Sequence, residues 1–247
     1  MFWKTWLILL ILALPTFWGL YFFGKRQIEP KYWVGLYKDY NFRDVGESLN
    51  SCLNEEKFHK NKIFRSNKYF SGWSCSSIHT PSIMFALNYD PKEPKKYYCV
   101  DPNGEKKFST HFDRGFKLEE SHLENPENWF NPKFSGIFCQ YLGSMVHHLA
   151  KGDSILIHCE AGRDRTGIMV GVLEAGLITR QKKKEDLLKS FSCDYKKTES
   201  LDPVKNATLE NLFSYFEKEL GDPSLYLTRV CHIDEWAIRK ASHAFMD

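Results

Sequence analysis

A cysteine and an arginine, Cys159 and Arg165, stand six positions apart in a stretch that can bring both to one anion. The apolar residues 155–157, just before the cysteine, predict a short buried strand. The largely apolar residues 166–178, just after the arginine, predict a helix. A loop between a strand and a helix N-terminus presents backbone amides that bind anions. The helix dipole and nearby arginines favour the thiolate form of a cysteine there, and a thiolate is a nucleophile.

This stretch resembles the signature loop of cysteine-dependent phosphatases, which is written H-C-x5-R-T/S-G. Residues 158–167 read HCEAGRDRTG, so every fixed position of that loop is present. The resemblance implies that Cys159 attacks phosphorus and that Arg165 holds two phosphate oxygens with its planar guanidinium. It also implies that backbone amides of the loop bind the phosphate, contributed by Glu160, Ala161, Gly162, Arg163, Asp164 and Arg165.

Three more residues of the stretch take supporting roles under this resemblance. His158 and Gly167 would hold the loop in shape, and the Thr166 hydroxyl would ease departure of the Cys159 thiolate from phosphorus. The implied reaction needs no metal and no cofactor. A buried core cysteine at the end of a strand is the alternative, but it does not account for the arginine and the glycine at these offsets.

The general acid that protonates the leaving group has two candidates, Asp164 and Asp113. Asp164 gives the loop the ending D-R-T, which resembles the loops of phosphoinositide phosphatases of the myotubularin and Sac types and of a lipid-active bacterial branch. Its alternative is a structural carboxylate that orients Arg165. Asp113 lies between an aromatic residue and a glycine in a predicted loop, a setting that suits a mobile acid. We favour Asp164.

Two upstream segments resemble a bacterial and fungal branch of these phosphatases that includes secreted tyrosine and lipid phosphatases. Residues 41–46, NFRDVG, match the opening of that branch, and residues 63–66, IFRS, match the strand that follows. The resemblance therefore assigns Arg43 and Arg65 to support of the phosphate loop, with ordinary ion pairs at strand ends as the alternative. At Asn88 the chain departs from the branch, whose strand ends in aspartate, leucine and arginine, so no role is carried to that position.

The order of the predicted elements gives an α/β fold, a central and mostly parallel sheet flanked by helices, as the phosphatase resemblance also implies. Apolar residues at helical spacing predict a helix over 134–149 with Ser135 as its N-cap. Further helices are expected over 186–191, 209–216 and 224–244, and a short strand over 97–100. Five prolines between residues 91 and 133 predict loops.

The first 26 residues form a separate segment, and the phosphatase domain is expected over residues 32–247. Residues 5–23 are almost wholly apolar, close to the minimum length of a membrane-spanning helix, and end in aromatic residues typical of a membrane interface. We therefore predict an uncleaved, single-pass membrane anchor, with a signal peptide as the alternative. Basic residues after the anchor favour a cytosolic domain, but such an anchor also starts export, so the side of the membrane is not decided. The six cysteines besides Cys159 allow three disulfides outside the cytosol.

The charge balance excludes one class of partner. Without the three basic residues among the first 26, the 34 lysines and arginines become 31, against 31 acids, which gives no support for nucleic-acid binding. The expected function is hydrolysis of phosphotyrosine in proteins, with dual specificity. Arg163, Asp164 and the anchor make phosphoinositides the alternative substrate. A phosphate-binding protein without turnover and a rhodanese-like sulfurtransferase are the remaining alternatives; the intact Cys159 and Arg165 argue against the first, and the ending Arg165-Thr166-Gly167 against the second.

Overall fold

The computed structural model describes residues 41–67, 83–90, 98–100, 103, 106–108, 118–178, 183–200 and 208–247 of the 247-residue chain. The membrane anchor predicted over residues 1–26 lies outside these ranges, and so does Asp113. Within the ranges, no helix is both long enough and apolar enough to cross a membrane.

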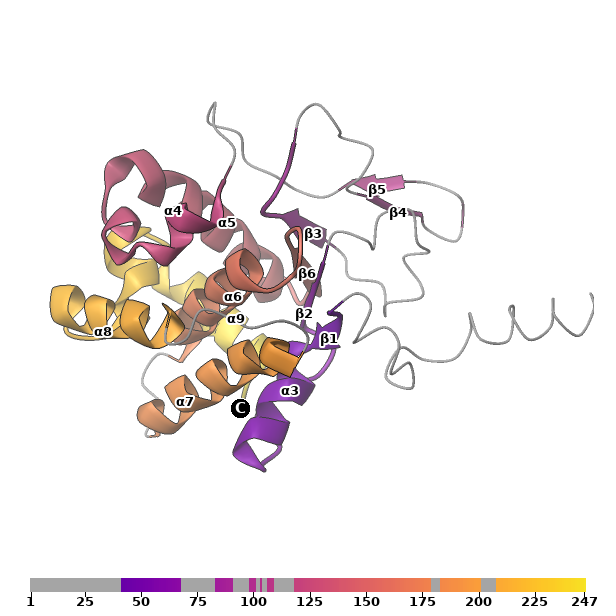
Figure 1. The fold of residues 1–247 in the computed structure, drawn as a ribbon. Coiled ribbons are helices and arrows are strands. Elements are labelled where there is room, and N and C mark those ends of the chain that lie inside the picture. Colours follow the sequence, from indigo (N-terminus) through magenta and orange to yellow (C-terminus); the bar gives the residue numbers. More distant parts are fainter. Residues whose placement is uncertain are drawn as a thin grey trace, which may run out of the picture.

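A four-stranded mixed sheet forms the centre of the fold (Figure 1). Its strands are, in spatial order, β1 Arg43–Asp44, β2 Ile63–Ser66, β6 Ile155–His158 and β3 Ile83–Ala86. β6 pairs in parallel with β2 and with β3, whereas β1 runs antiparallel to β2. The register places His158 beside Ser66 and Ala86, so all three parallel strands end at the same edge. Cys159 follows at this edge, where open α/β sheets bind their ligands.

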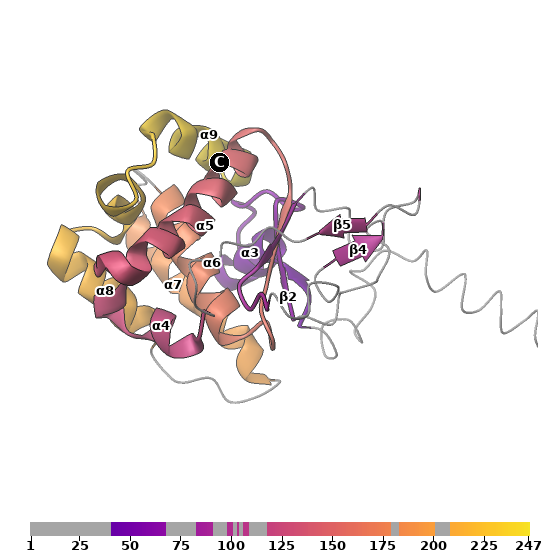
Figure 2. The ribbon, with the colours of Figure 1, turned by 90° about the horizontal axis from the view of Figure 1, so that it is seen from above.

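Most of the described helices lie together on one side of this sheet, as Figures 1 and 2 show. They are α3 Val45–Leu53, α4 Glu120–Glu124, α5 Pro132–Ala150, α6 Asp164–Leu177, α7 Lys184–Lys196, α8 Thr208–Leu220 and α9 Glu235–Phe245. A two-stranded antiparallel sheet, β4 Tyr98–Val100 and β5 Lys106–Phe108, lies on the other side in both views. The predicted α/β class is therefore confirmed, with one antiparallel pairing in the central sheet.

The helix predicted over 134–149 forms as α5, but it begins earlier than expected. The side chain of Asn131 accepts a hydrogen bond from the Lys133 amide, and Pro132 occupies the first turn. An asparagine cap followed by proline is a strong helix start, because proline has no N–H to leave unpaired and its φ already suits a helix. Ser135 is therefore inside the helix, and its prediction as the N-cap was wrong.

The end of the chain differs most from the predicted helices. The short helix expected over 186–191 forms as the longer α7. In the N-terminal part of the described chain, α3 was not predicted. The helix expected over 224–244 is broken into η7 Pro223–Leu225, η8 Tyr226–Val230 and α9. The break falls at His232, whose φ of 54° is incompatible with a continuous right-handed helix.

Two disulfides join helices within the described residues. Cys52 on α3 is bonded to Cys193 on α7, and Cys139 on α5 is bonded to Cys231 just after η8. Both bonds close long stretches of chain, 141 and 92 residues, and such cross-links stabilise a fold largely by restricting the unfolded chain.

The apolar core fills the space between the sheet and the helices. Ile155 and Ile157 of β6 are fully buried in it, and α6 is buried on nearly all of its faces. The hydroxyl of Tyr141 on α5 donates to the carbonyl of Ala86, which ties α5 to the end of β3. The strand that leads to Cys159 and the helix that follows it are thus both embedded in the core.

Candidate active site

The phosphate loop predicted from the sequence connects β6 to α6. Cys159 directly follows β6 and is only 2% exposed, and α6 begins at Asp164. Cys159 is also the free cysteine of the described residues, whereas Cys52, Cys139, Cys193 and Cys231 are paired in disulfides. The strand, the loop and the helix N-terminus therefore stand in the order that anion binding requires.

Behind the loop lies a layer of buried hydrogen-bond donors. The Asn41 side chain donates to the carbonyls of Ala161, at 3.3 Å, and Gly162, at 2.7 Å. The guanidinium of Arg65 donates through Nη2 to the carbonyls of Gly162, at 3.0 Å, and Arg163, at 3.2 Å. Three consecutive loop carbonyls are thus held from behind.

This arrangement sets the direction of the loop amides. In a trans peptide, the carbonyl and the following N–H point in opposite directions. Because the carbonyls of residues 161–163 face the donor layer, the N–H groups of residues 162–164 face the other way. A row of N–H groups turned to one side is a suitable cradle for phosphate oxygens. The geometry therefore accounts for the phosphate-binding role that the resemblance gave to these residues.

Arg43 and Arg65 meet at one carboxylate, that of Asp194 on α7. Arg43 reaches it through Nε at 2.8 Å, and Arg65 reaches it through Nη1 at 2.7 Å. Arg43 also donates through Nη1 to the side-chain oxygen of Asn41, at 2.6 Å. The structure brings both predicted arginines behind the loop, Arg65 in direct contact and Arg43 through Asn41. Both arginines also form ion pairs with Asp194, so ion pairing and contact with the loop or with Asn41 occur side by side.

Two glycines allow this close packing. Gly162 has φ +66°, and a Cβ on it would lie 2.3 Å from the carbonyl oxygen of Ser66. A Cβ on Gly167 would lie 2.3 Å from the ring of Tyr195 and 3.0 Å from Nη2 of Arg65. The predicted supporting role of Gly167 thus has a steric basis: it lets the first turn of α6 approach the donor layer.

In front of the loop, the short helix α4 borders the site. Nη1 of Arg165 donates to the carbonyl of Leu118, at 2.9 Å, just before α4 begins. Nε of Arg163 pairs with Oδ2 of Asp164, at 2.7 Å. Asp164 is 4% exposed, and its Oδ1 has no hydrogen-bond partner among the described residues.

Two glutamates of α4 lie close to Asp164. Carboxylate oxygens of Glu120, Glu124 and Asp164 all lie within 4.8 Å of one another. Such a group could ligate a cation, although acidic groups at this spacing are also common without one. The sequence-predicted acid Asp164 therefore has two carboxyl neighbours that were not predicted.

The remaining predicted residues of the loop are also placed. His158 is buried, and burial lowers its pKa to about 4, so the imidazole is neutral at pH 7. Thr166 is fully buried, and its hydroxyl has no hydrogen-bond partner within the described part of the chain. The side chain of Glu160 accepts a hydrogen bond from Asn88, at 3.1 Å. Asn88, to which the resemblance gave no role, thus contacts the loop at the residue after Cys159.

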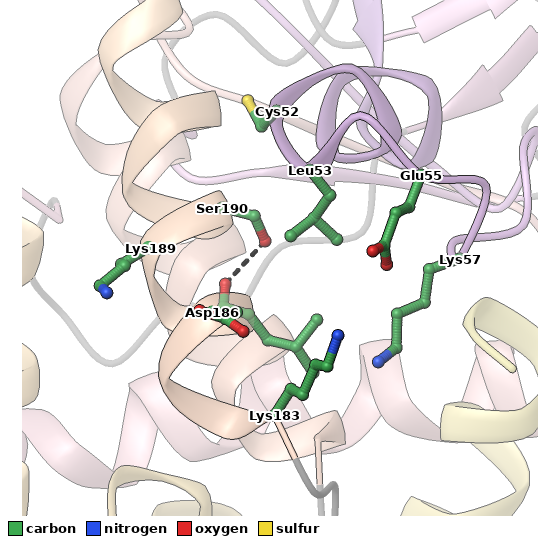
Figure 3. A pocket seen from close by; sticks show the side chains of 9 residues that line it. Cys52, Leu53, Glu55, Lys57, Lys183, Asp186, Lys189 and Ser190 are labelled. Atoms are coloured by element: carbon green, nitrogen blue, oxygen red, sulfur yellow. Dashed lines mark hydrogen bonds between the residues drawn. The ribbon is translucent and has the colours of Figure 1, made fainter.

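A cavity of about 300 Å³ lies away from the loop, between α3 and α7 (Figure 3). Figure 3 shows the side chains of Lys57, Lys183 and Lys189 around it, with Glu55, Asp186 and the disulfide-bonded Cys52. None of the residues predicted for catalysis lines this cavity. The chemistry of the chain is therefore expected at the loop and not here.

Four residues at the site were missed by the sequence predictions: Asn41, Asp194, Glu120 and Glu124. Asn41 stands in the NFRDVG segment quoted for the resemblance, so its place in that motif was a usable indication. Asp194 lies 35 residues after Cys159 in a charged helix, and no local pattern distinguishes it from its neighbours. The glutamates of α4 are equally ordinary in sequence.

A comparison with known families agrees with this geometry. Residues 138–247 match the model of the tyrosine phosphatase family. The chain fits the cysteine-dependent tyrosine phosphatase superfamily. The match includes β6, the phosphate loop and every later element, and it supports a phosphatase among the hydrolases.

A curated protein is also similar to part of this phosphatase-type chain. It comes from Porphyromonas gingivalis (strain ATCC BAA-308 / W83) and is named a thiol protease. The two are 37% identical over 83 residues, which are 32% of this chain and 16% of that protein. The chain thus spans a small part of the length of this relative.

Proposed function

We propose that this chain hydrolyses phosphate monoesters through a phosphocysteine intermediate, with phosphotyrosine in proteins as its substrate and dual specificity. The observation that carries the proposal is the loop at residues 159–165, whose carbonyls are bonded to buried donors while its amides face the opposite side. A nucleophilic cysteine at the base of such a loop and an arginine at its end are what phosphoryl transfer to sulfur requires.

In the first step, the thiolate of Cys159 attacks phosphorus. A bond forms between sulfur and phosphorus, and the bond from phosphorus to the ester oxygen breaks. The leaving oxygen takes a proton from a general acid. Arg165 and the loop amides stabilise the negative charge on the phosphoryl oxygens as it shifts.

In the second step, water attacks the phosphorus of the phosphocysteine. The general acid, deprotonated by the first step, takes a proton from this water and is restored. The bond from phosphorus to sulfur breaks and inorganic phosphate leaves, while the Thr166 hydroxyl donates to the departing thiolate. His158, neutral and buried, supports the loop without exchanging a proton. Neither step calls for a metal or a cofactor.

Asp164 is the proposed general acid. It pairs with Arg163 at 2.7 Å, and carboxylate oxygens of Glu120 and Glu124 lie within 4.8 Å of its own. Asp164 begins α6 beside the loop, and a general acid must lie this close to the reacting phosphate to reach the leaving oxygen. Asp113 remains the other candidate.

A phosphoinositide is the second candidate substrate, because Arg163 lies beside the loop and is 20% exposed at its side chain. A cation there suits a headgroup with more than one phosphate. Because Arg163 already pairs with Asp164, less of its positive charge is available to a second phosphate. Phosphotyrosine therefore remains the first choice. A phosphate-binding protein without turnover and a rhodanese-like sulfurtransferase are less well supported, since Cys159 and Arg165 are both present.

The location we propose is the outer side of a membrane, with residues 1–26 as a single-pass anchor. The two disulfides support this side, because disulfides persist in oxidising compartments and are rare in the cytosol. The predicted positive charges after the anchor favour the opposite side. A reporter fusion or protease accessibility in intact cells decides between the two orientations.

The test is phosphate release by the full-length protein from p-nitrophenyl phosphate, a phosphotyrosine peptide, a phosphoserine peptide and a panel of phosphoinositide vesicles. We expect release from the first three in the presence of a metal chelator, and no release by Cys159→Ser on any of them; a silent phosphoserine peptide would remove the dual specificity. Phosphoinositide turnover with a silent phosphopeptide would move the assignment to the second substrate. Equal activity of wild type and Cys159→Ser would overturn the mechanism.

A further inference from the structure

We infer that Asp194 is a positioning residue for the reaction: its carboxylate fixes the two arginines that support the phosphate loop. The inference rests on the proposed function of that loop and adds a residue from α7, outside the motif. No part of Asp194 is needed at the substrate, so its effect is transmitted through Arg43, Arg65 and Asn41.

The carboxylate of Asp194 is the point where the supports converge. Oδ1 accepts from Nε of Arg43, at 2.8 Å, and from the hydroxyl of Ser48, at 2.5 Å, while Oδ2 accepts from Arg65, at 2.7 Å. The backbone carbonyl of Asp194 also accepts from Nη2 of Arg43, at 2.8 Å. Three side chains from the N-terminal part of the described chain, between residues 43 and 65, are thus bonded to one residue of α7.

Each arginine has one guanidinium nitrogen that does not bind Asp194 and that leads to the loop, directly in Arg65 and through Asn41 in Arg43. Arg65 gives Nη1 to Asp194 and Nη2 to the carbonyls of Gly162 and Arg163. Arg43 gives Nη1 to Asn41, whose amide then donates to the carbonyl of Gly162. Two routes therefore run from Asp194 to the peptide that contains the Gly162 carbonyl, and the planar guanidinium gives each route a fixed geometry.

The negative charge of Asp194 is essential to this arrangement, not only its hydrogen bonds. Arg65 is fully buried and Arg43 is 8% exposed, so two like charges lie side by side away from water. Burial by itself would raise the pKa of Asp194, but Arg43 and Arg65 outweigh it and hold that pKa below its ordinary range. An uncharged side chain at this position would leave the two guanidinium groups to repel each other.

Glu174 on α6 provides a matched control within the same layer. It is as buried as Asp194, but burial, with repulsion from Asp194 second, raises its pKa well above the ordinary value. This shift favours the protonated form of Glu174, and Glu174→Gln is close to that form in charge and in shape. The two buried carboxyl groups thus separate the effect of charge from the effect of a buried polar side chain.

The loop amides act more on the transition state than on the bound substrate, because charge on the phosphoryl oxygens is redistributed during transfer. A displacement of the loop by about 1 Å costs about 10²-fold in rate. We therefore expect Asp194→Asn to lower kcat by about 10²-fold and to change KM less, and to weaken inhibition by orthovanadate in parallel with kcat/KM. Asp194→Glu, which keeps the charge, should recover part of kcat.

The experiment compares full-length wild type, Asp194→Asn, Asp194→Glu and Glu174→Gln in steady-state hydrolysis of p-nitrophenyl phosphate and in orthovanadate inhibition. Circular dichroism and a count of free thiols establish that each variant is folded with its disulfides intact. Wild type must first be active and Cys159→Ser inactive; failure there refutes the proposed function. With that met, Asp194→Asn that keeps kcat within about twofold overturns only this inference.

Removal of one partner from a buried ion pair is strongly destabilising, so a second variant covers the case in which Asp194→Asn does not fold. Ser48→Ala is the milder variant, since it removes one hydrogen bond to Oδ1 and leaves the charge in place. We expect a fall in kcat of about threefold to tenfold, less than the full value of a hydrogen bond to a charged group because both arginines still hold the carboxylate. A Ser48→Ala protein with wild-type kcat and wild-type orthovanadate inhibition would contradict the inference.

Discussion

The back and the front of the phosphate loop are built on different principles. Behind the loop, Asn41, Arg43, Arg65 and Asp194 are all less than 9% exposed and bonded to one another or to loop carbonyls. In front of it, Glu120 and Glu124 are half-buried on a helix of five residues. In the proposed mechanism, the back holds the loop in a fixed geometry, whereas the front carries the groups that exchange protons and meet the substrate.

This difference predicts which changes affect shape and which affect chemistry. A buried charge network is costly to disturb, because each charge depends on its partners for the solvation that it has lost. A half-exposed carboxyl group can gain or lose a proton with little change in structure. Variants of the back should therefore lose rate at every pH, and variants of the front should change the pH dependence.

The largest effect is expected from Gly162→Ala at the back. A Cβ there would collide with the backbone of Ser66, which cannot give way as a flexible side chain would, and φ +66° adds strain. We expect kcat/KM for p-nitrophenyl phosphate to fall by roughly 10²- to 10³-fold. Gly152→Ala is the control, since its φ is +88° but nothing lies within 4 Å of the new Cβ. Similar losses in both variants would mean that strain at positive φ, and not the contact behind the loop, is responsible.

The buried His158, which directly precedes the loop, makes the free energy of unfolding depend on pH. Its pKa is about 4 in the folded protein and 6.5 in the unfolded chain, so the unfolded chain binds more protons between these values. The contribution of His158 is complete above pH 6.5 and is lost as the pH falls toward 4, by roughly 3 kcal/mol of unfolding free energy. Urea denaturation of wild type and His158→Gln at pH 7.5 and pH 4.5 measures it. The variant should lose less stability between the two pH values; an equal loss would exclude His158 as a source.

Arg65→Lys should affect the back more moderately. A lysine carries one compact ammonium and cannot contact Asp194 and two loop carbonyls with a planar fork. We expect kcat to fall by about tenfold to 10²-fold at all pH values. Arg239→Lys is the matched control, because Arg239 lies on exposed α9 in a solvent-accessible pair with Glu235. A shifted pH optimum in Arg65→Lys would argue against a purely geometric role.

The smallest change in rate is expected from Asp164→Asn at the front. General acid catalysis contributes about 10²- to 10⁴-fold in general, but p-nitrophenolate leaves with little need of a proton, so we expect a loss of about tenfold on p-nitrophenyl phosphate. If Asp164 is the acid, the alkaline limb of the rate profile should disappear, while the acidic limb remains. Glu124→Gln provides the comparison from the same carboxyl cluster. If only Glu124→Gln loses the alkaline limb, Glu124 of α4 is the general acid instead of Asp164. If neither variant loses it, Asp113 remains as the candidate.

The centre of the site, the loop itself, could be predicted from sequence because its residues are adjacent in the chain, whereas Glu120 and Glu124 of the front were missed. The strand, the loop, the helix and the roles of Cys159 and Arg165 follow from fourteen consecutive residues, 154–167. The helix α5 follows from its apolar spacing, and the α/β class follows from the order of the elements.

The donor layer behind the loop could be predicted only in part. The resemblance pointed to Arg43 and Arg65, but their shared partner comes from α7, 129 residues after Arg65. Hydrophobic periodicity reports which face of a helix is buried, and it gives no indication that a charged residue on that face is paired. The break at His232 was missed for a similar reason, because a left-handed residue leaves no mark in the apolar spacing.

The disulfide between Cys52 and Cys193 has a practical consequence for handling the protein. The nucleophile must be a free thiol, whereas the residue next to Asp194 must stay in a disulfide, so one chain needs two opposite redox states. Cys159 is shielded by burial, but Cys52 lines the cavity in Figure 3 and is within reach of a small thiol reagent. A reducing agent added to preserve the nucleophile would therefore also act on the link between α3 and α7. Activity measured in strong reductant would describe a protein whose scaffold has been opened beside its own active site.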